Sequence, residues 1–287
     1  MIETVIGQRR RDLGGFEVGR VLPHPGHRMV GPFVFFDHMG PADLPAGIGR
    51  ERDVRPHPHI GLATVTYLFS GEIVHRDSVG SALPIEPGAV NWMTAGRGIT
   101  HSERFERARR QGDLVHGIQA WVALPRELEE TEPAFAHYAA DVLPVREEHG
   151  ARVRLIAGTL DGVRAPVQTL SPLFYQHAEL AAGARVSLGT EYAERGVYVA
   201  VGTIELGGQL IAAGNLAVLT PGRAAQVIAL TPAVVMLLGG EPVGERFIEW
   251  NFVASSRERI EAAKADWRAG RFKLPDLDHD EFIPLPD

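Results

Sequence analysis

The chain has 287 residues, 45% hydrophobic and 23% charged, which are the proportions of an ordinary globular protein. Its formal net charge of −7 argues against direct binding to nucleic acid, which requires a clustered basic face. The absence of cysteine excludes disulfides, thiolate metal sites and cysteine nucleophiles.

The N-terminus lacks the charged-then-apolar pattern of a signal peptide. No apolar run approaches the ~20 residues that are needed to span a bilayer. The sequence therefore predicts a cytoplasmic protein without a membrane segment.

Short apolar runs bounded by Gly, Pro or Asp follow one another along the chain. They are rich in Val, Ile, Phe and Tyr, and they lie at 33–36, 63–69, 89–93, 118–124, 153–157, 196–201, 216–219 and 233–238. This pattern favours an all-β sandwich or barrel. Helical spacing is convincing once, where Ser255 or Ser256 can cap a helix that Gly270 ends. The proline-rich tail 273–287 is predicted to be extended along the surface.

Two patterns from the first half recur in the same order in the second half. The pairs are Tyr67-x3-Gly71-x-Ile73 with Tyr198-x3-Gly202-x-Ile204, and Gly88-x5-Thr94-x-Gly96 with Gly214-x5-Thr220-x-Gly222. Two matches in register predict a duplicated β domain. The acidic and polar stretch 127–150 is the natural linker region between the copies.

Two short motifs predict a metal site. One residue separates His57 from His59, and one separates His101 from Glu103. Because residues i and i+2 of a strand point to the same face, both members of each pair can reach one point. Three imidazoles and one carboxylate form a ligand set that suits a first-row divalent metal.

The second copy of the repeat lacks these ligands. The two repeat offsets place four non-ligating residues at the corresponding positions: Leu188, Thr190, Val227 and Ala229. Because all four candidate ligands are replaced together, the simplest interpretation is one metal-binding domain and one metal-free sister domain.

Other polar residues give weaker signals. His38 could line the pocket, and Arg97 could orient a carboxylate or an anionic substrate, or bond backbone carbonyls as a loop arginine. The remaining histidines show no paired spacing and are interpreted as surface or hydrogen-bonded buried residues: His24, His27, His75, His116, His137, His149, His177 and His279. No serine nucleophile elbow, phosphate-binding loop or dinucleotide-binding glycine motif is present.

Longer motifs surround the two ligand pairs. They are Pro56-His57-Pro58-His59-x-Gly61, Thr64-Val65-Thr66-Tyr67-Leu68, His75-Arg76-Asp77-Ser78 and Asn91-Trp92-Met93-Thr94-Ala95-Gly96-Arg97-Gly98-Ile99-x-His101-Ser102-Glu103. With these motifs, most of the chain resembles the pirin family of the cupin superfamily.

This resemblance implies a bicupin, with two tandem jelly-roll β-barrels and a short C-terminal helix. The expected domains are a metal-binding cupin over 1–130, a linker region over 131–150, and a metal-free cupin over 151–287 that includes the helix and tail. The family's ligand positions match the four residues reached above: His57, His59, His101 and Glu103. Pirins often have Arg, Phe and Glu after the first histidine pair, where this chain has Ile60, Leu62 and Ala63.

Some pirins are similar to quercetin 2,3-dioxygenases, which open a flavonol ring with O₂. The resemblance thus implies a mononuclear dioxygenase that acts on quercetin or a related small aromatic substrate, with Glu103 also serving as the base that deprotonates the substrate hydroxyl. Fe(II) is the expected metal, with Ni, Cu, Mn, Co or Zn as alternatives. The alternative function is a metal- or redox-dependent regulatory protein that binds a transcription factor or a metabolic enzyme. A third is an oxygenase or isomerase for another small molecule.

Overall fold

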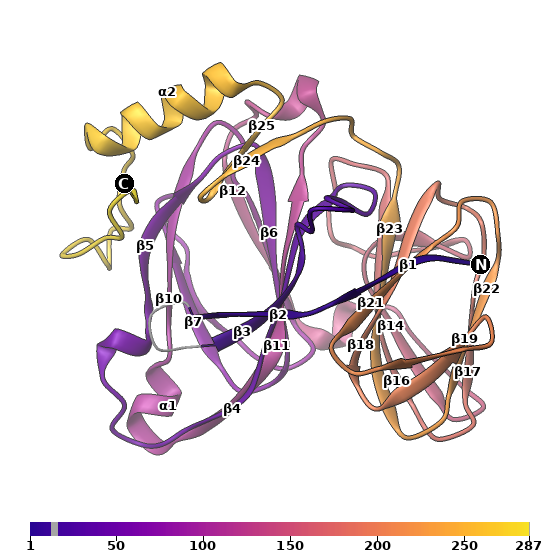
Figure 1. Ribbon diagram of the computed structural model, residues 1–287. Coiled ribbons are helices and arrows are strands. Elements are labelled where there is room, and N and C mark those ends of the chain that lie inside the picture. The colour runs from indigo at the N-terminus through magenta and orange to yellow at the C-terminus, as the bar shows by residue number, and fades with distance from the viewer. Residues whose placement is uncertain (13–16, 287) are drawn as a thin grey trace. The chain divides into compact units, whose positions relative to one another are not determined.

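The computed structural model describes residues 1–12 and 17–286, and most of its regular structure is β-strand (Figure 1). The predicted all-β fold is therefore confirmed. Contacts between residues divide the chain into two compact units. Unit 1 comprises Met1–Arg10, Gly19–His38 and Asp141–Pro242, and unit 2 comprises Arg11–Val18, Met39–Ala140 and Val243–Asp287. Asp287, the end of the predicted tail, lies outside the described residues.

Unit 1 is built from two sheets around one apolar core. The larger sheet has the order β1 (Ile2–Gly7), β21 (Asn215–Leu219), β18 (Glu194–Val201), β23 (Ala233–Gly240), β16 (Leu173–Leu180), β14 (Ala151–Leu160) and β13 (Val145–Glu148), with β15 (Val163–Arg164) beside β14. The smaller sheet has the order β17 (Arg185–Leu188), β22 (Ala225–Ala229), β19 (Thr203–Leu206) and β20 (Gln209–Ala212). Val197 of the larger sheet and Val227 of the smaller one belong to the same buried cluster, so the sheets enclose the core between them.

Unit 2 has the same construction. Its larger sheet includes, in order, β12 (Ala134–Tyr138), β9 (Val90–Thr94), β6 (Leu62–Ser70), β11 (Asp113–Ala123) and β4 (Phe33–Leu44). Its smaller sheet has the order β5 (Val54–His59), β10 (Ile99–Arg104), β7 (Ile73–Asp77) and β8 (Ala82–Ile85). Leu68 on β6 and Ile73 on β7 share one buried cluster. The chain passes between the units along β2 (Arg9–Asp12), β3 (Glu17–Leu22) and β4.

The two smaller sheets have equivalent strand orders, which confirms the duplication that the repeat predicts. Their registers also refine the alignment of the copies. His101 pairs with His57 in unit 2, whereas Val227 pairs with Val186 in unit 1. The counterpart of His57 is thus Val186, two residues before the predicted Leu188. Its buried apolar side chain belongs to the unit 1 core.

The C-terminal segment packs within unit 2, although the predicted domain ranges place it with the second copy. Helix α2 (Arg257–Arg268) follows the hairpin of β24 (Phe247–Glu249) and β25 (Phe252–Ala254) and lies next to it (Figure 1). Its buried residues Ile260, Ala263 and Trp267 join Ile60 and Phe252 in one apolar cluster. This burial of an amphipathic face explains why the helix belongs with the strands of the first copy.

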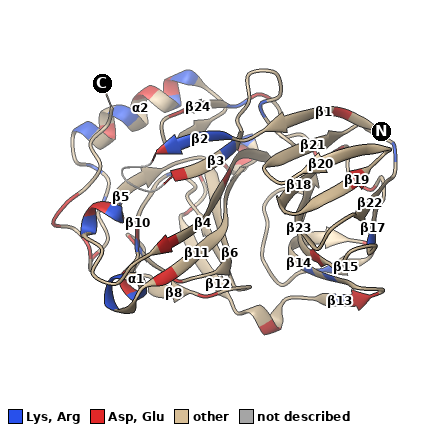
Figure 2. Ribbon diagram, turned by 60° about the horizontal axis from the view of Figure 1, so that its bottom comes forward, with Lys and Arg blue, Asp and Glu red and all other residues tan. Residues whose placement is uncertain are grey.

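The predicted start of α2 is confirmed, because the Ser256 hydroxyl accepts a hydrogen bond from the amide of Arg259 at 3.2 Å. Basic and acidic residues follow one another along the helix, as blue and red segments of the ribbon (Figure 2). A second, short helix, α1 (Glu106–Gln111), was not predicted, and of its residues only Ala108 is buried. Among the described residues, no helix combines the length and hydrophobicity needed to cross a membrane.

Several short elements complete the described fold. They are the 3₁₀ turns η1 (Arg50–Arg52), η2 (Arg126–Leu128) and η3 (Ala140–Val142). Of these, η3 falls with β12 and β13 in the stretch 131–150 that the sequence presents as a linker region, and η2 lies just before it. The stretch therefore carries regular structure, and β12 and β13 add strands to the larger sheets of unit 2 and unit 1 respectively.

Candidate metal centre

Strand β5 carries the first histidine pair at the edge of the smaller sheet in unit 2. Pro56 and Pro58 alternate with the histidines and have no amide hydrogen to donate. Proline is tolerated in such a position because an edge strand is paired on one side only. The tail lies along this edge, since the amide of Ile283 donates to the carbonyl of Pro56 at 2.8 Å.

Strand β10 carries the second pair and runs antiparallel to β5. His101 lies directly opposite His57, while Glu103 lies opposite Val54. The register shifts between these two positions, and β5 contributes one extra residue there. Such a bulge changes the direction of the side chains beside it and is common near functional sites.

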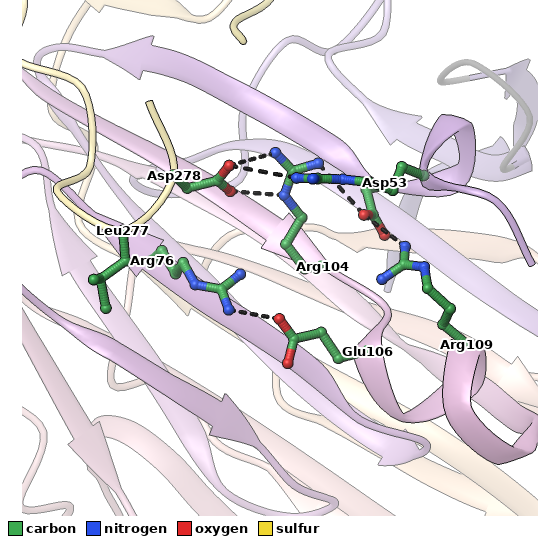
Figure 3. Close-up of a pocket in the computed structure, with 8 residues that line it drawn as sticks. Asp53, Arg76, Arg104, Glu106, Arg109, Leu277 and Asp278 are labelled. Atoms are coloured by element: carbon green, nitrogen blue, oxygen red, sulfur yellow. Dashed lines mark hydrogen bonds and ion pairs between the residues drawn. The ribbon is translucent and has the colours of Figure 1, made fainter. Parts of the chain in front are cut away.

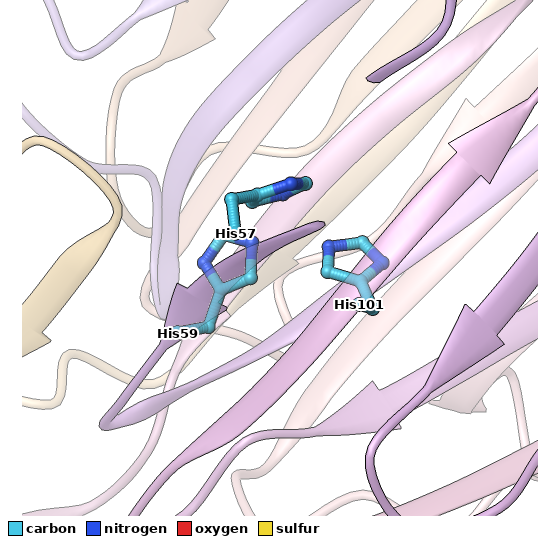
Figure 4. Close-up of side chains that lie close together, drawn as sticks. All are labelled: His57, His59 and His101. Carbon is cyan, nitrogen blue, oxygen red and sulfur yellow. The ribbon is translucent and has the colours of Figure 1, made fainter. Parts of the chain in front are cut away.

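The three histidines converge. Their ring nitrogens form a group in which one ligand atom from each residue lies within 4.8 Å of the others (Figure 4). The ring centroids of His57 and His101 are 4.4 Å apart, and His59 is 5.0 Å from His57 and 5.1 Å from His101. The structure thus brings together the three imidazoles whose convergence the strand periodicity predicted.

Backbone carbonyls orient two of these rings. Nδ1 of His57 donates to the carbonyl of Arg55 at 2.9 Å, and Nδ1 of His59 donates to the carbonyl of Asn251 at 2.9 Å. A neutral imidazole carries one proton, so in both residues Nε2 keeps its lone pair. An unprotonated nitrogen held in this way is the form that binds a metal.

Burial keeps the three imidazoles neutral. Desolvation lowers the pKa of His57 to about 4, and the hydrogen bond to Arg55 only partly opposes this effect. Desolvation, with repulsion from the neighbouring histidines, lowers the pKa of His59 and His101 well below the usual value. The group is therefore ready to bind a cation without first releasing protons.

Glu103 is buried and lies two residues after His101 on β10. It is not among the three residues whose ligand atoms lie within 4.8 Å of one another. Desolvation raises its pKa to about 7. A buried carboxyl group without a compensating charge favours the protonated form, and a bound cation would reverse this preference.

The residues present fit a divalent transition metal. The donors are neutral imidazoles, and Nε2 of His101 is a buried polar atom that has no hydrogen-bond partner. Native proteins seldom leave such an atom unsatisfied unless an ion, a water or a catalytic role accounts for it. An imidazole cluster of this kind suits Fe, Ni, Cu or Zn.

His75 and Asp77 on β7 were missed as parts of the site. Strand β7 pairs with β10, which places Asp77 opposite His101 and His75 opposite Glu103. Nδ1 of His75 is 3.4 Å from Nδ1 of His101, and Nε2 of His75 is 2.9 Å from Oδ2 of Asp77. Their i, i+2 spacing was the available signal, since it repeats the alternation of the two ligand pairs.

The other candidates have different roles. Arg97 forms an ion pair with Glu132, and its carbonyl accepts a hydrogen bond from Arg259 at 2.7 Å. This arginine therefore orients a carboxylate of the protein itself. Nδ1 of His38 lies 2.8 Å from the Tyr198 hydroxyl within unit 1, and His38 is not part of the histidine group.

A polar cavity of about 270 Å³ lies beside the outward-facing residues of β10 in unit 2 (Figure 3). The guanidinium of Arg104 binds both carboxylate oxygens of Asp278 at 2.7 Å, and Ser102 donates to the same carboxylate at 2.6 Å. Asp53 accepts one hydrogen bond from Arg104 at 3.4 Å and one from Arg109 at 2.7 Å. Ser102 and Arg104, which alternate with the candidate ligands along β10, therefore fasten the C-terminal tail.

The two-barrel fold, with a group of three histidines in unit 2 that could hold a metal ion, defines the chain as a bicupin protein with a candidate metal site. Comparison with known families agrees: the Pirin model matches residues 15–122, and the Pirin C-terminal cupin domain model matches residues 175–273. The chain belongs to the pirin family.

Individual relatives extend over the same range. A pirin-like protein of Caulobacter vibrioides is 59% identical over 100% of both chains. A crystal structure of quercetin 2,3-dioxygenase from Acinetobacter baumannii is 32% identical, with a TM-score of 0.91 over 99% of this chain and 95% of that one. A bacterial pirin from Escherichia coli in complex with nickel(II) has a TM-score of 0.66 over 84% of this chain and 100% of that one. At 17% identity, it supports the fold alone.

Proposed function

We propose that this protein is a mononuclear metal-dependent dioxygenase that opens the ring of quercetin or a related flavonol with O₂. The observation that carries the proposal is the convergence of three buried, neutral imidazoles within 4.8 Å on β5 and β10. The relative named quercetin 2,3-dioxygenase, 32% identical over nearly the whole chain, supports the substrate class.

His57, His59 and His101 would hold the metal, with Glu103 as a fourth ligand. A redox-active metal such as Fe(II) would supply a site at which a phenolate oxygen and O₂ can be brought together. We propose iron because the reaction requires O₂ activation. Nickel is the first alternative, because an imidazole cluster also suits that metal.

Glu103 would also act as the general base. Burial raises its pKa to about 7 in the metal-free site, and a bound cation would favour the ionised carboxylate, which can then accept a proton from a phenolic hydroxyl. The pKa of Glu103 is raised because burial removes the carboxylate from water. Water therefore competes little with a substrate hydroxyl for the carboxylate oxygens. Its role would be to hold the substrate proton after the substrate binds.

The surroundings of the histidines suit a flat aromatic molecule. Trp121 lies edge-on to His59, with ring centroids 5.0 Å apart, and Phe135 stacks on His75 at 4.4 Å. His57 and Glu103 keep the largest exposed fractions of the four candidate ligands, 7% and 9%. We propose that the substrate approaches the metal from the side of these two residues.

The test is O₂ consumption by the iron-loaded protein with quercetin, compared with the Glu103→Gln variant at equal metal content. The proposal predicts quercetin-dependent O₂ uptake that the substitution reduces by at least about 100-fold, the typical contribution of a general base. Protein with a full metal site that leaves quercetin and a panel of related flavonols unconsumed would contradict the proposal. That outcome would favour a regulatory role, tested by partner binding that changes with the iron oxidation state.

A further inference from the structure

The third imidazole is oriented differently from the other two. Backbone carbonyls accept the Nδ1 protons of His57 and His59, but Nδ1 of His101 faces a side chain, Nδ1 of His75, at 3.4 Å. The other nitrogen of His75 lies 2.9 Å from Oδ2 of Asp77. A line of three side chains thus runs from the carboxylate of Asp77 through His75 to the proposed metal ligand.

The direction of each hydrogen bond follows from its donors. Oδ1 of Asp77 accepts from the backbone amides of Val79 at 3.0 Å and Ser81 at 2.9 Å, which can only donate. Oδ2 then accepts from Nε2–H of His75. A neutral His75 keeps a lone pair on Nδ1, so His101 must donate through Nδ1 and leave Nε2 unprotonated.

The remaining contacts hold this arrangement in place. His75 and Asp77 are both buried, with exposed fractions of 3% and 1%, and Phe135 stacks on the His75 ring with an interplanar angle of 19°. Nε2 of His101 is buried without a hydrogen-bond partner, as expected for a nitrogen reserved for a ligand.

We propose that Asp77 and His75 are positioning residues that fix the metal-binding tautomer of His101 and thereby set the affinity of the centre for its metal. The proposal rests on the metal site described above. The proposal adds that two residues of β7, which do not bind the metal themselves, determine which nitrogen of His101 is available to it. A carboxylate joined to a ligating imidazole also strengthens the donor character of the metal-binding nitrogen.

Asp77→Asn is the sharpest variant. Because the amides of Val79 and Ser81 require an acceptor at the Oδ1 position, the new NH₂ group must face His75. His75 would then accept at Nε2 and carry its proton on Nδ1, where it opposes the proton of His101. The side-chain shape is kept while the hydrogen bonds are reversed.

The experiment measures Ni(II) affinity by competition with a chelator and the absorption spectrum of the Co(II)-loaded protein. Asp77→Asn is expected to weaken Ni(II) binding by about 10- to 100-fold and to shift the Co(II) bands. Asp113→Asn is the matched control, because Asp113 pairs with Arg107 and lies outside the histidine group. It should bind Ni(II) as the parent protein does.

A second variant separates positioning from folding. His75→Phe removes the hydrogen bonds that join Asp77 to His101 but can keep the stacking with Phe135. Adding Asp77→Asn to this variant should cause no further loss of Ni(II) affinity. Unchanged Ni(II) affinity and Co(II) spectra in both single variants, or additive losses in the double variant, would overturn the proposal. A parent protein that binds neither metal would instead refute the metal centre itself.

Discussion

His57 and His101 face each other as directly paired residues of β5 and β10, with their ring centroids 4.4 Å apart. Two imidazoles at this separation repel each other when charged, and burial adds a desolvation penalty. The folded protein therefore keeps them neutral. Because protonation of this pair disfavours both the folded state and metal binding, the stability and the metal affinity of the protein should both depend on pH.

The first prediction concerns acid stability of the metal-free protein. The unfolded chain protonates His57 below about pH 6.5, whereas the folded chain does so only below about pH 4. Between these values the unfolded state binds more protons, so the free energy of unfolding falls as the pH is lowered. The loss from His57 is on the order of 3 kcal/mol between pH 7 and pH 4.

Chemical denaturation of the His57→Gln variant at several pH values measures this effect. The stability advantage of the parent protein over the variant should shrink as the pH falls through this window. His149→Gln, which changes an exposed histidine, is the control. Parallel pH curves for the parent and His57→Gln would show that His57 is not the group responsible.

The second prediction concerns Glu103 as a ligand. Its pKa of about 7 means that the metal-free site is mostly protonated there at pH 6 and mostly ionised at pH 8. Metal binding should therefore release about one proton near pH 6 and far less near pH 8, because a ligating carboxylate must be ionised. The histidines contribute little, since burial holds their pKa values well below this range.

Calorimetry in buffers of different ionisation enthalpy counts these protons. Glu103→Gln should abolish the release at pH 6 and weaken metal binding. If the variant releases as many protons as the parent protein, another group titrates and Glu103 is not a ligand.

The third prediction concerns the tail. Arg104 is 1% exposed, and its main partner is Asp278. The arginine lowers the pKa of Asp278, against the opposing effect of burial. Asp278→Ala removes two charged hydrogen bonds but leaves Asp53 at 3.4 Å and Glu281 at 3.0 Å beside the buried guanidinium. The substitution should therefore cost about 1.5–3 kcal/mol of unfolding free energy.

Urea denaturation and limited proteolysis of the tail check this expectation. The control is Asp276→Ala, which removes an exposed pair with Lys273 and should cost less than about 1 kcal/mol. Equal losses in the two variants would mean that the buried anchor does not stabilise the fold.

The sequence predicted the features that depend on local periodicity. The i, i+2 spacing of His57 and His59 on one strand was sufficient to place both on one face. The helix around Ile260 could also be predicted, because its N-cap and the spacing of its apolar residues are set by residues close together in the sequence. The replacement of the ligands by non-ligating residues in the second copy followed from the repeat, with the counterpart of His57 corrected from Leu188 to Val186.

The features that depend on strand order could not be read in this way. The i, i+2 spacing of His75 and Asp77 is local and places both on one face of β7, but they lie beside the histidine group only because β7 pairs with β10, and no local pattern specifies that neighbour. Asp278 reaches Arg104 across 174 positions of the chain, so its burial is also a consequence of tertiary structure. The bulge that shifts Glu103 relative to Val54 likewise arises from pairing between strands.

The most direct test of the metal centre is the metal content per chain of the purified protein and its His101→Ala variant, after loading with Fe(II) under anaerobic conditions. Val227→Ala, at the corresponding buried position of the other barrel, is the control. The parent protein and Val227→Ala should each bind about one metal ion, and His101→Ala should bind little, because it loses a ligand. Normal occupancy in folded His101→Ala would contradict the assignment.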